Sequence, residues 1–74
     1  MASQDQTRFY RKLGAKILQA RIDSVLEQSE VANKIGKTQS YVSKIESGDI
    51  KVDLYTLTLL AKAFRKPIGH FISE

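Results

Sequence analysis

The chain has 74 residues, of which 42% are hydrophobic and 27% are charged, and this balance is typical of one small globular domain rather than a disordered segment. Twelve Lys and Arg against eight Asp and Glu leave a net charge of +4, which favours an anionic partner, either nucleic acid or a membrane surface. There is no cysteine and only one histidine, His70, so a disulfide framework, a cysteine nucleophile and a structural zinc site are excluded.

Neither a membrane-spanning segment nor a secretory signal is expected. The longest nearly apolar stretch, 57–61, is far shorter than the roughly 20 residues needed to span a bilayer. Residues 1–7 lack both a basic start and an apolar run. We therefore expect a cytoplasmic protein with no membrane partner.

The first predicted element is a helix over about 7–23, preceded by a polar, disordered tail at 1–7. Apolar residues recur along this helix every three or four positions and form one inward stripe. The stripe consists of Phe9, Leu13, Ile17 and Ala20. The outer face is basic and either is solvated or meets phosphates; it carries Arg8, Arg11, Lys12 and Lys16.

Two short helices follow, one over 28–35 and one that runs to about 47. Gly36 suits the left-handed residue that ends a helix, because a residue without a Cβ adopts that conformation at least cost. Thr38 is the predicted N-cap of the second helix, since its hydroxyl can accept a hydrogen bond from a free amide of the next turn. The inward positions of the two helices are Val31, Ala32, Ile35, Val42 and Ile45.

Two more helices complete the prediction. The first is capped by Asp53, and its apolar stripe consists of Leu54, Leu57, Leu60, Ala61 and Phe64. Pro67 cannot continue that helix but can begin a new one, whose apolar positions are Ile68, Phe71 and Ile72. Five short helices with brief connections predict an all-α domain over residues 8–74.

The functional signal lies within 28–47. Ala32 is small where the two helices cross, and Gly36 lets the chain reverse, which is the helix-turn-helix arrangement whose second helix lies in the DNA major groove. Together with its flanks, the chain resembles the phage-repressor/Cro-type helix-turn-helix family, the XRE-like transcriptional regulators, over about 8–72. The matching positions are Leu13, Gly14, Ile17, Arg21, Gln28, Val31, Ala32, Gly36, the run 38–46, Gly48, Leu57, Leu60, Ala61 and Phe64.

The resemblance implies a compact five-helix lambda-repressor-like fold and roles for the matching residues. Gln28 contacts a phosphate and braces the start of the recognition helix, and Arg21 and Glu46 form a salt bridge. The positions expected to read base edges are Gln39, Ser40, Ser43 and Lys44. The expected phosphate contacts are Gln28, Lys37, Thr38, Tyr41 and Lys51.

Two residues depart from the family pattern, and one position stays open. Lys37 stands where the family more often has a small aliphatic residue, so its stem is expected to cover the core while its ammonium meets a phosphate. Glu27 would point an acid toward the phosphates. Tyr41 either stacks on the DNA backbone or packs on the protein.

The chemistry of the outer face supports base reading without the resemblance. Gln39 carries a donor and an acceptor on one planar amide and can pair with adenine at two points. Lys44 can donate to guanine with less geometric precision than arginine, while serine discriminates weakly. The helix starts at Gln28 and Thr38 offer free amides and a partial positive charge to phosphates.

A homodimer is expected, because one short helix buries too little surface for tight specific binding. Two copies would place their recognition helices about 34 Å apart on a pseudo-palindromic operator. The apolar C-terminal residues either form the dimer patch or close the core: Phe64, Ile68, Phe71 and Ile72.

The sequence therefore predicts a sequence-specific DNA-binding transcriptional regulator, a repressor or controller protein, whose partners are double-stranded DNA and a second copy of itself. No cofactor or small-molecule ligand is expected. An antitoxin-like or coactivator-type protein-interaction module with the same fold is the alternative. Asp49 and Asp53 suit a turn and a cap rather than paired catalytic carboxylates, so an enzyme is not expected.

Overall fold

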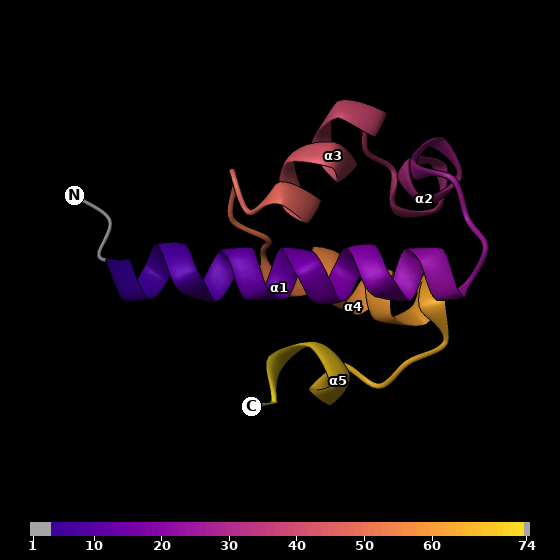
Figure 1. Cartoon of the computed structure of the whole chain (residues 1–74). Coiled ribbons are helices and arrows are strands. Elements are labelled where there is room, and N and C mark those ends of the chain that lie inside the picture. Colours follow the sequence, from indigo (N-terminus) through magenta and orange to yellow (C-terminus); the bar gives the residue numbers. More distant parts are fainter. Residues whose placement is uncertain (1–3, 74) are drawn as a thin grey trace.

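Residues 4–73 are described by a computed structural model, and they form five helices and no strand. The predicted all-α architecture is confirmed. The long first helix runs through the middle of the molecule, with the second and third helices on one side and the fifth on the other (Figure 1). The helices are α1 (Gln4–Asp23), α2 (Gln28–Ile35), α3 (Gln39–Ser47), α4 (Leu54–Phe64) and α5 (Gly69–Ile72).

Helix α1 starts earlier than predicted. It begins at Gln4, so the expectation of a disordered tail was wrong for residues 4–7, while residues 1–3 lie outside the described part. Asp5 stands in the first turn, where the helix dipole favours a negative charge. Phe9 was expected to face inward but is 48% exposed, because the first turns of α1 extend past the other helices (Figure 1).

Local signals set the ends of α2 and α3, whose bounds agree with the predicted ones. The Glu27 amide donates to Glu30 Oε1 at 2.8 Å and so caps the start of α2. Gly36 ends α2 in the left-handed region with φ of 70°. Thr38 Oγ1 accepts a hydrogen bond from the Tyr41 amide at 3.1 Å, which makes it the N-cap of α3.

Helix α4 begins after Asp53, as predicted, but the Asp53 side chain does not form the expected capping hydrogen bond. The neighbouring hydroxyl of Thr56, and to a lesser extent its amide, hold the pKa of the Asp53 carboxyl below the ordinary value of 3.8. Leu54 was expected to be buried but is 69% exposed, whereas Thr56 is 2% exposed. At 3.6 residues per turn, Leu54 lies at the edge of the inward stripe and Thr56 lies nearer its centre.

Gly14 lies where the backbones of α1 and α3 come close together. A Cβ at this position would lie 2.6 Å from the backbone oxygen of Glu46 and closer still to that of Ile45. Both atoms belong to the backbone of α3, so they cannot give way unless the helix moves. Gly48, which ends α3 with φ of 81°, meets α1 in the same manner, because its Cβ would lie 2.8 Å from the Cα of Arg11.

The core lies between α1 and the other four helices. Its buried apolar residues come from every helix and from the α3–α4 segment, and they are Leu13, Ile17, Ala20, Val31, Ala32, Ile35, Val42, Ile45, Val52, Leu57, Leu60, Ala61, Phe64 and Phe71. Within residues 4–73, no helix has the length and apolar character needed to cross a membrane.

Of the C-terminal residues expected to form a dimer patch, the structure buries two and leaves two partly or largely exposed. Phe64 and Phe71 are 4% and 2% exposed, and their ring centroids lie 6.3 Å apart. They are therefore not available to a second copy, because they close the core between α4 and α5. Ile68 is half-buried against the core, and only Ile72 is exposed.

Candidate nucleic-acid interface

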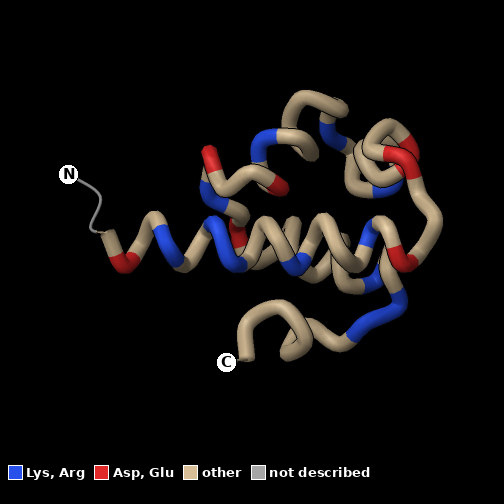
Figure 2. Tube along the Cα trace, viewed as in Figure 1, with Lys and Arg blue, Asp and Glu red and all other residues tan. Residues whose placement is uncertain are grey.

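Basic residues occur on several helices rather than on α3 alone (Figure 2). Arg8 and Arg11 are exposed along α1, and Lys51 is exposed in the segment that joins α3 to α4. Lys16 is half-buried, and its Nζ donates to the Ser73 carbonyl oxygen at 2.8 Å. The basic side chains of α1 therefore do not form one continuous face, since Lys16 extends toward α5 and away from α3.

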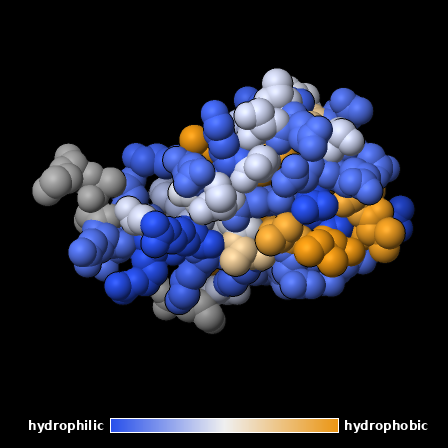
Figure 3. Space-filling view, turned by 45° about the horizontal axis from the view of Figure 1, so that its top comes forward, coloured by the Kyte–Doolittle hydropathy of each residue, from blue (hydrophilic) through white to orange (hydrophobic). Residues whose placement is uncertain are grey.

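Helix α3 presents a polar face to solvent. Val42 and Ile45 are 0% and 1% exposed and hold the opposite face of α3 against the core. In Figure 3 the upper part of the molecule, over α2 and α3, is mainly hydrophilic, and hydrophobic surface gathers near the end of α1. All the residues predicted to read base edges are exposed: Gln39, Ser40, Ser43 and Lys44.

An ion pair joins α1 to the C-terminal end of α3. Arg21 Nε lies 2.6 Å from Glu46 Oε2, and Arg21 Nη2 lies 3.3 Å from Glu46 Oε1. The remaining nitrogen, Nη1, donates to the Leu26 carbonyl oxygen at 2.9 Å. The Arg21 and Glu46 side chains are 15% and 5% exposed, so the pair is largely removed from water. Its two-point geometry fixes both side chains.

Gln28 extends this network to the start of α3. Its Nε2 donates to Glu46 Oε1 at 2.9 Å, and its Oε1 accepts from Gln39 Nε2 at 3.4 Å. The bracing role that the resemblance implies for Gln28 thus has a defined geometry. The second N–H of Gln28, and the carbonyl oxygen and second N–H of Gln39, form no hydrogen bond with the residues described.

Lys37 and Tyr41 form a pair at the N-terminal end of α3. Lys37 Nζ lies 5.2 Å from the centroid of the Tyr41 ring, within the range of a cation–π interaction. Tyr41 is half-buried and packs against the core cluster, so the structure places its ring on the protein. The exposed ammonium of Lys37 is consequently held beside Thr38, the N-cap of α3.

Sequence reasoning missed three of these features. The Leu26 carbonyl that accepts from Arg21 has no signature in its side chain. The capping role of Glu27 was detectable, because Glu30 stands three residues later as in a capping box. The pairing of Lys37 with Tyr41 was not detectable, because Lys37 precedes the N-cap of α3 and the spacing rule for side chains on one helix does not apply to it.

The arrangement of α2 and α3 matches a known family. A family model described as Helix-turn-helix matches residues 17–71, a range that includes both motif helices and both members of the ion pair. The chain belongs to the XRE-like helix-turn-helix family. This family consists of DNA-binding transcriptional regulators.

Two similar proteins help to place this helix-turn-helix domain. It is 31% identical over 62 residues to an uncharacterized transcriptional regulator in the ATPase CF(0) region of Rhodospirillum rubrum, a match that covers 84% of this chain and 57% of that protein. The chain therefore spans little more than half of that relative. In structure it is similar to the restriction-modification controller protein C.AhdI from Aeromonas hydrophila, with a TM-score of 0.87, 26% identity and coverage of 93% of this chain and 100% of the other.

Replacing Arg21 by Met should lower the free energy of unfolding by about 3 kcal/mol, because the Glu46 carboxylate would stay buried without its cation. The matched control is Gln19→Ala. It removes the exposed hydrogen bond from Gln19 to Asp23 on the same helix, which contributes about 0.5 kcal/mol or less. Urea denaturation measures both variants. If Arg21→Met lowered the free energy of unfolding no more than Gln19→Ala does, the ion pair would not be what holds α3 in place.

Proposed function

We propose that this domain binds double-stranded DNA sequence-specifically through the major groove and acts in the cytoplasm as a transcriptional repressor or controller. One observation carries the proposal. The residues at the predicted base-reading positions are exposed together on α3, whose other face is buried. A short helix with one polar outward face has the size and chemistry to enter the groove.

Gln39 is the residue best prepared to distinguish one base from another. Its Nε2 lies 3.4 Å from Gln28 Oε1, and its remaining N–H and its oxygen match the edge of adenine. Lys44 and the two exposed serines, Ser40 and Ser43, add contacts of lower geometric precision.

Lys37 and the start of α3 supply affinity that does not depend on sequence. The Lys37 ammonium stands at the surface beside the N-terminal end of α3, where the helix dipole favours a phosphate. Phosphate contacts position a protein on the duplex without reading bases. Lys51 adds an exposed positive charge in the segment that follows α3.

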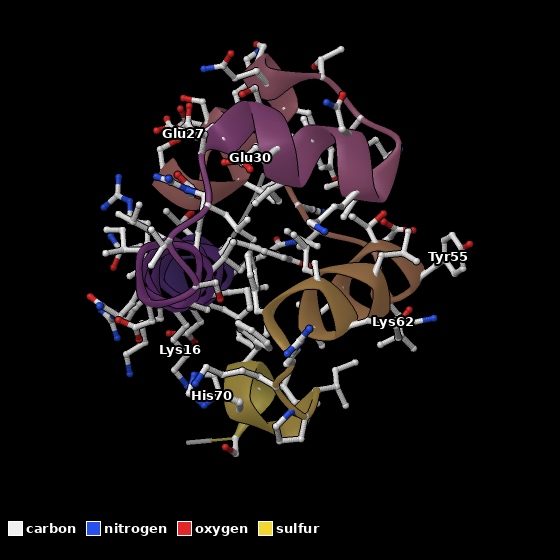
Figure 4. All side chains as sticks on the ribbon, turned by 90° about the vertical axis from the view of Figure 1, so that its right-hand side faces the viewer. Lys16, Glu27, Glu30, Tyr55, Lys62 and His70 are labelled. Atoms are coloured by element: carbon white, nitrogen blue, oxygen red, sulfur yellow. The ribbon has the colours of Figure 1, made fainter. Side chains whose placement is uncertain are left out.

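The proposed homodimer requires a partner that lies beside the domain. If α3 faces the DNA, a two-fold axis through the operator brings the second copy alongside. A contact through α5, on the opposite side of α1 from α3 (Figure 1), would turn the second α3 away from the same duplex. The outer face of α4 lies at the side, and Tyr55 projects from it (Figure 4).

The α4 surface is also apolar enough to associate. Leu54 and Tyr55 are each 69% exposed, and Leu59 on the same helix is half-buried. We therefore assign the dimer contact to α4 instead of the C-terminal residues first considered.

Site selection from random DNA, followed by titration of variants, tests the reading function. Gln39→Ala should reduce discrimination between the selected site and random duplex by about ten- to a hundredfold, because one two-point base contact is lost. Lys37→Ala should weaken binding to both duplexes alike. The slope of log K against log salt concentration should also become shallower by about one. The charge-matched control is Lys12→Ala. Lys12 lines the groove between α1 and α5, so its loss should leave the salt slope unchanged.

Equal binding of selected and random duplex by the unaltered protein would defeat the specific-reader proposal. A protein-interaction module would then be the better interpretation.

Self-association is tested by sedimentation of the Tyr55→Lys variant. A charge on the outer face of α4 should shift the protein toward a monomer and weaken binding to a two-fold operator, while binding to a half-site is kept. Ile22→Lys is the control, because Ile22 is 53% exposed on α1. If Ile22→Lys dissociates the protein and Tyr55→Lys does not, the assignment to α4 is wrong.

A further inference from the structure

A groove between α1 and α5 stands apart from the surfaces used so far. Its volume is about 410 Å³, within the range of small-molecule sites. It lies on the side of α1 away from α3 (Figure 1) and does not include the outer face of α4. Its apolar lining consists of Phe9, Leu13, Phe71 and Ile72.

The walls of this groove are apolar and partly open to solvent. Phe9 and Ile72 are each 48% exposed, while Leu13 and Phe71 behind them are buried. Phe9 is the residue of the α1 stripe that the core does not cover, and Ile72 is the exposed residue of α5. An apolar chain laid between them would remove both side chains from water, which is favourable in proportion to the area covered.

Two lysines one helical turn apart line the same groove. Lys16 extends from α1 toward α5 (Figure 4), where its Nζ donates to the Ser73 carbonyl oxygen. An ammonium has three N–H donors, so two remain. Lys12 is exposed, and neither lysine forms an ion pair with any carboxylate among residues 4–73. The groove thus combines apolar walls with two lysines that have no carboxylate partner among the residues described.

We propose that this groove binds a small amphipathic carboxylate, of the class of medium-chain fatty acids. The alkyl chain lies between Phe9 and Ile72 over Leu13 and Phe71, and the carboxylate accepts hydrogen bonds from Lys12 and Lys16. Charge favours this occupant, because a carboxylate gains charge-assisted hydrogen bonds from both ammonium groups that a neutral chain cannot form, and a short anion would leave the walls exposed. The ligand bridges α1 and α5 without touching α3.

Octanoate is the probe, followed by ¹⁵N NMR and thermal unfolding of the full chain. Octanoate should shift the amide resonances of residues 12–16 and 71–73 and should raise Tm with concentration, since a ligand of the folded state stabilises it by mass action. Octanol and acetate, which carry only one half of the ligand's chemistry, should bind at least about fivefold more weakly.

Three variants locate the site. Ala15→Trp fills the groove from an exposed position and should abolish the shifts. Lys12→Gln should weaken octanoate binding about fivefold. Lys62→Gln, on the opposite side at α4 (Figure 4), should leave it unchanged. Circular dichroism checks that each variant is folded.

Several results would overturn the proposal. Octanol binding as tightly as octanoate, or Lys12→Gln binding octanoate normally, would show that the lysines take no part. Acetate binding as tightly as octanoate would show that the apolar walls take no part. If raising the protein concentration alone shifts the same resonances, a second copy covers the groove and no fatty acid site exists.

Discussion

The position of α3 depends on the ion pair between Arg21 and Glu46. Burying two charges costs desolvation energy, and the cost is offset only where the remaining donors and acceptors are also satisfied. Here Leu26 accepts from the third nitrogen of Arg21, and Gln28 donates to Glu46. The satisfied network therefore connects the end of α1, the start of α2 and the end of α3, and through Gln28 it reaches Gln39 at the start of α3.

Close packing complements the polar network. Gly14 lets the backbone of α3 approach α1 so closely that no Cβ fits between them, and Val42 and Ile45 fill the interior side. Because interiors are packed without spare volume, α3 has little freedom to roll about its axis. A fixed axis determines which residues face outward, and this is how a buried glycine and a buried ion pair govern the chemistry of an exposed helix face.

The sequence was most informative where structure is decided locally. The bounds of α2 and α3 follow from a cap and a glycine, Thr38 and Gly36, whose effects extend over one turn. The outward set on α3 followed from helical periodicity alone. The Arg21–Glu46 pair was expected only through the family resemblance, because residues 25 positions apart in the chain carry no local sign of contact.

The sequence predictions failed where the burial of a residue depends on which other helices pack against it. Phe9 and Leu54 continue apolar stripes, but periodicity does not tell which end of a stripe another helix covers. Phe64 and Phe71 are large apolar residues of the kind found in dimer interfaces, and only the packing of α5 shows that they belong to the core. The start of α1 at Gln4 was missed because polar residues such as Gln and Asp are compatible with both a helix and a tail.

We propose a different task for each of three faces: DNA binding for α3, self-association for α4 and small-ligand binding for the α1–α5 groove. The DNA-facing role of α3 is the central claim, and intermolecular NOEs between the protein and a selected duplex test it most directly. The account predicts NOEs from the side chains of Gln39, Ser40, Ser43 and Lys44 to major-groove base protons. NOEs that arise from α4 or α1, with the α3 side chains showing none, would contradict it.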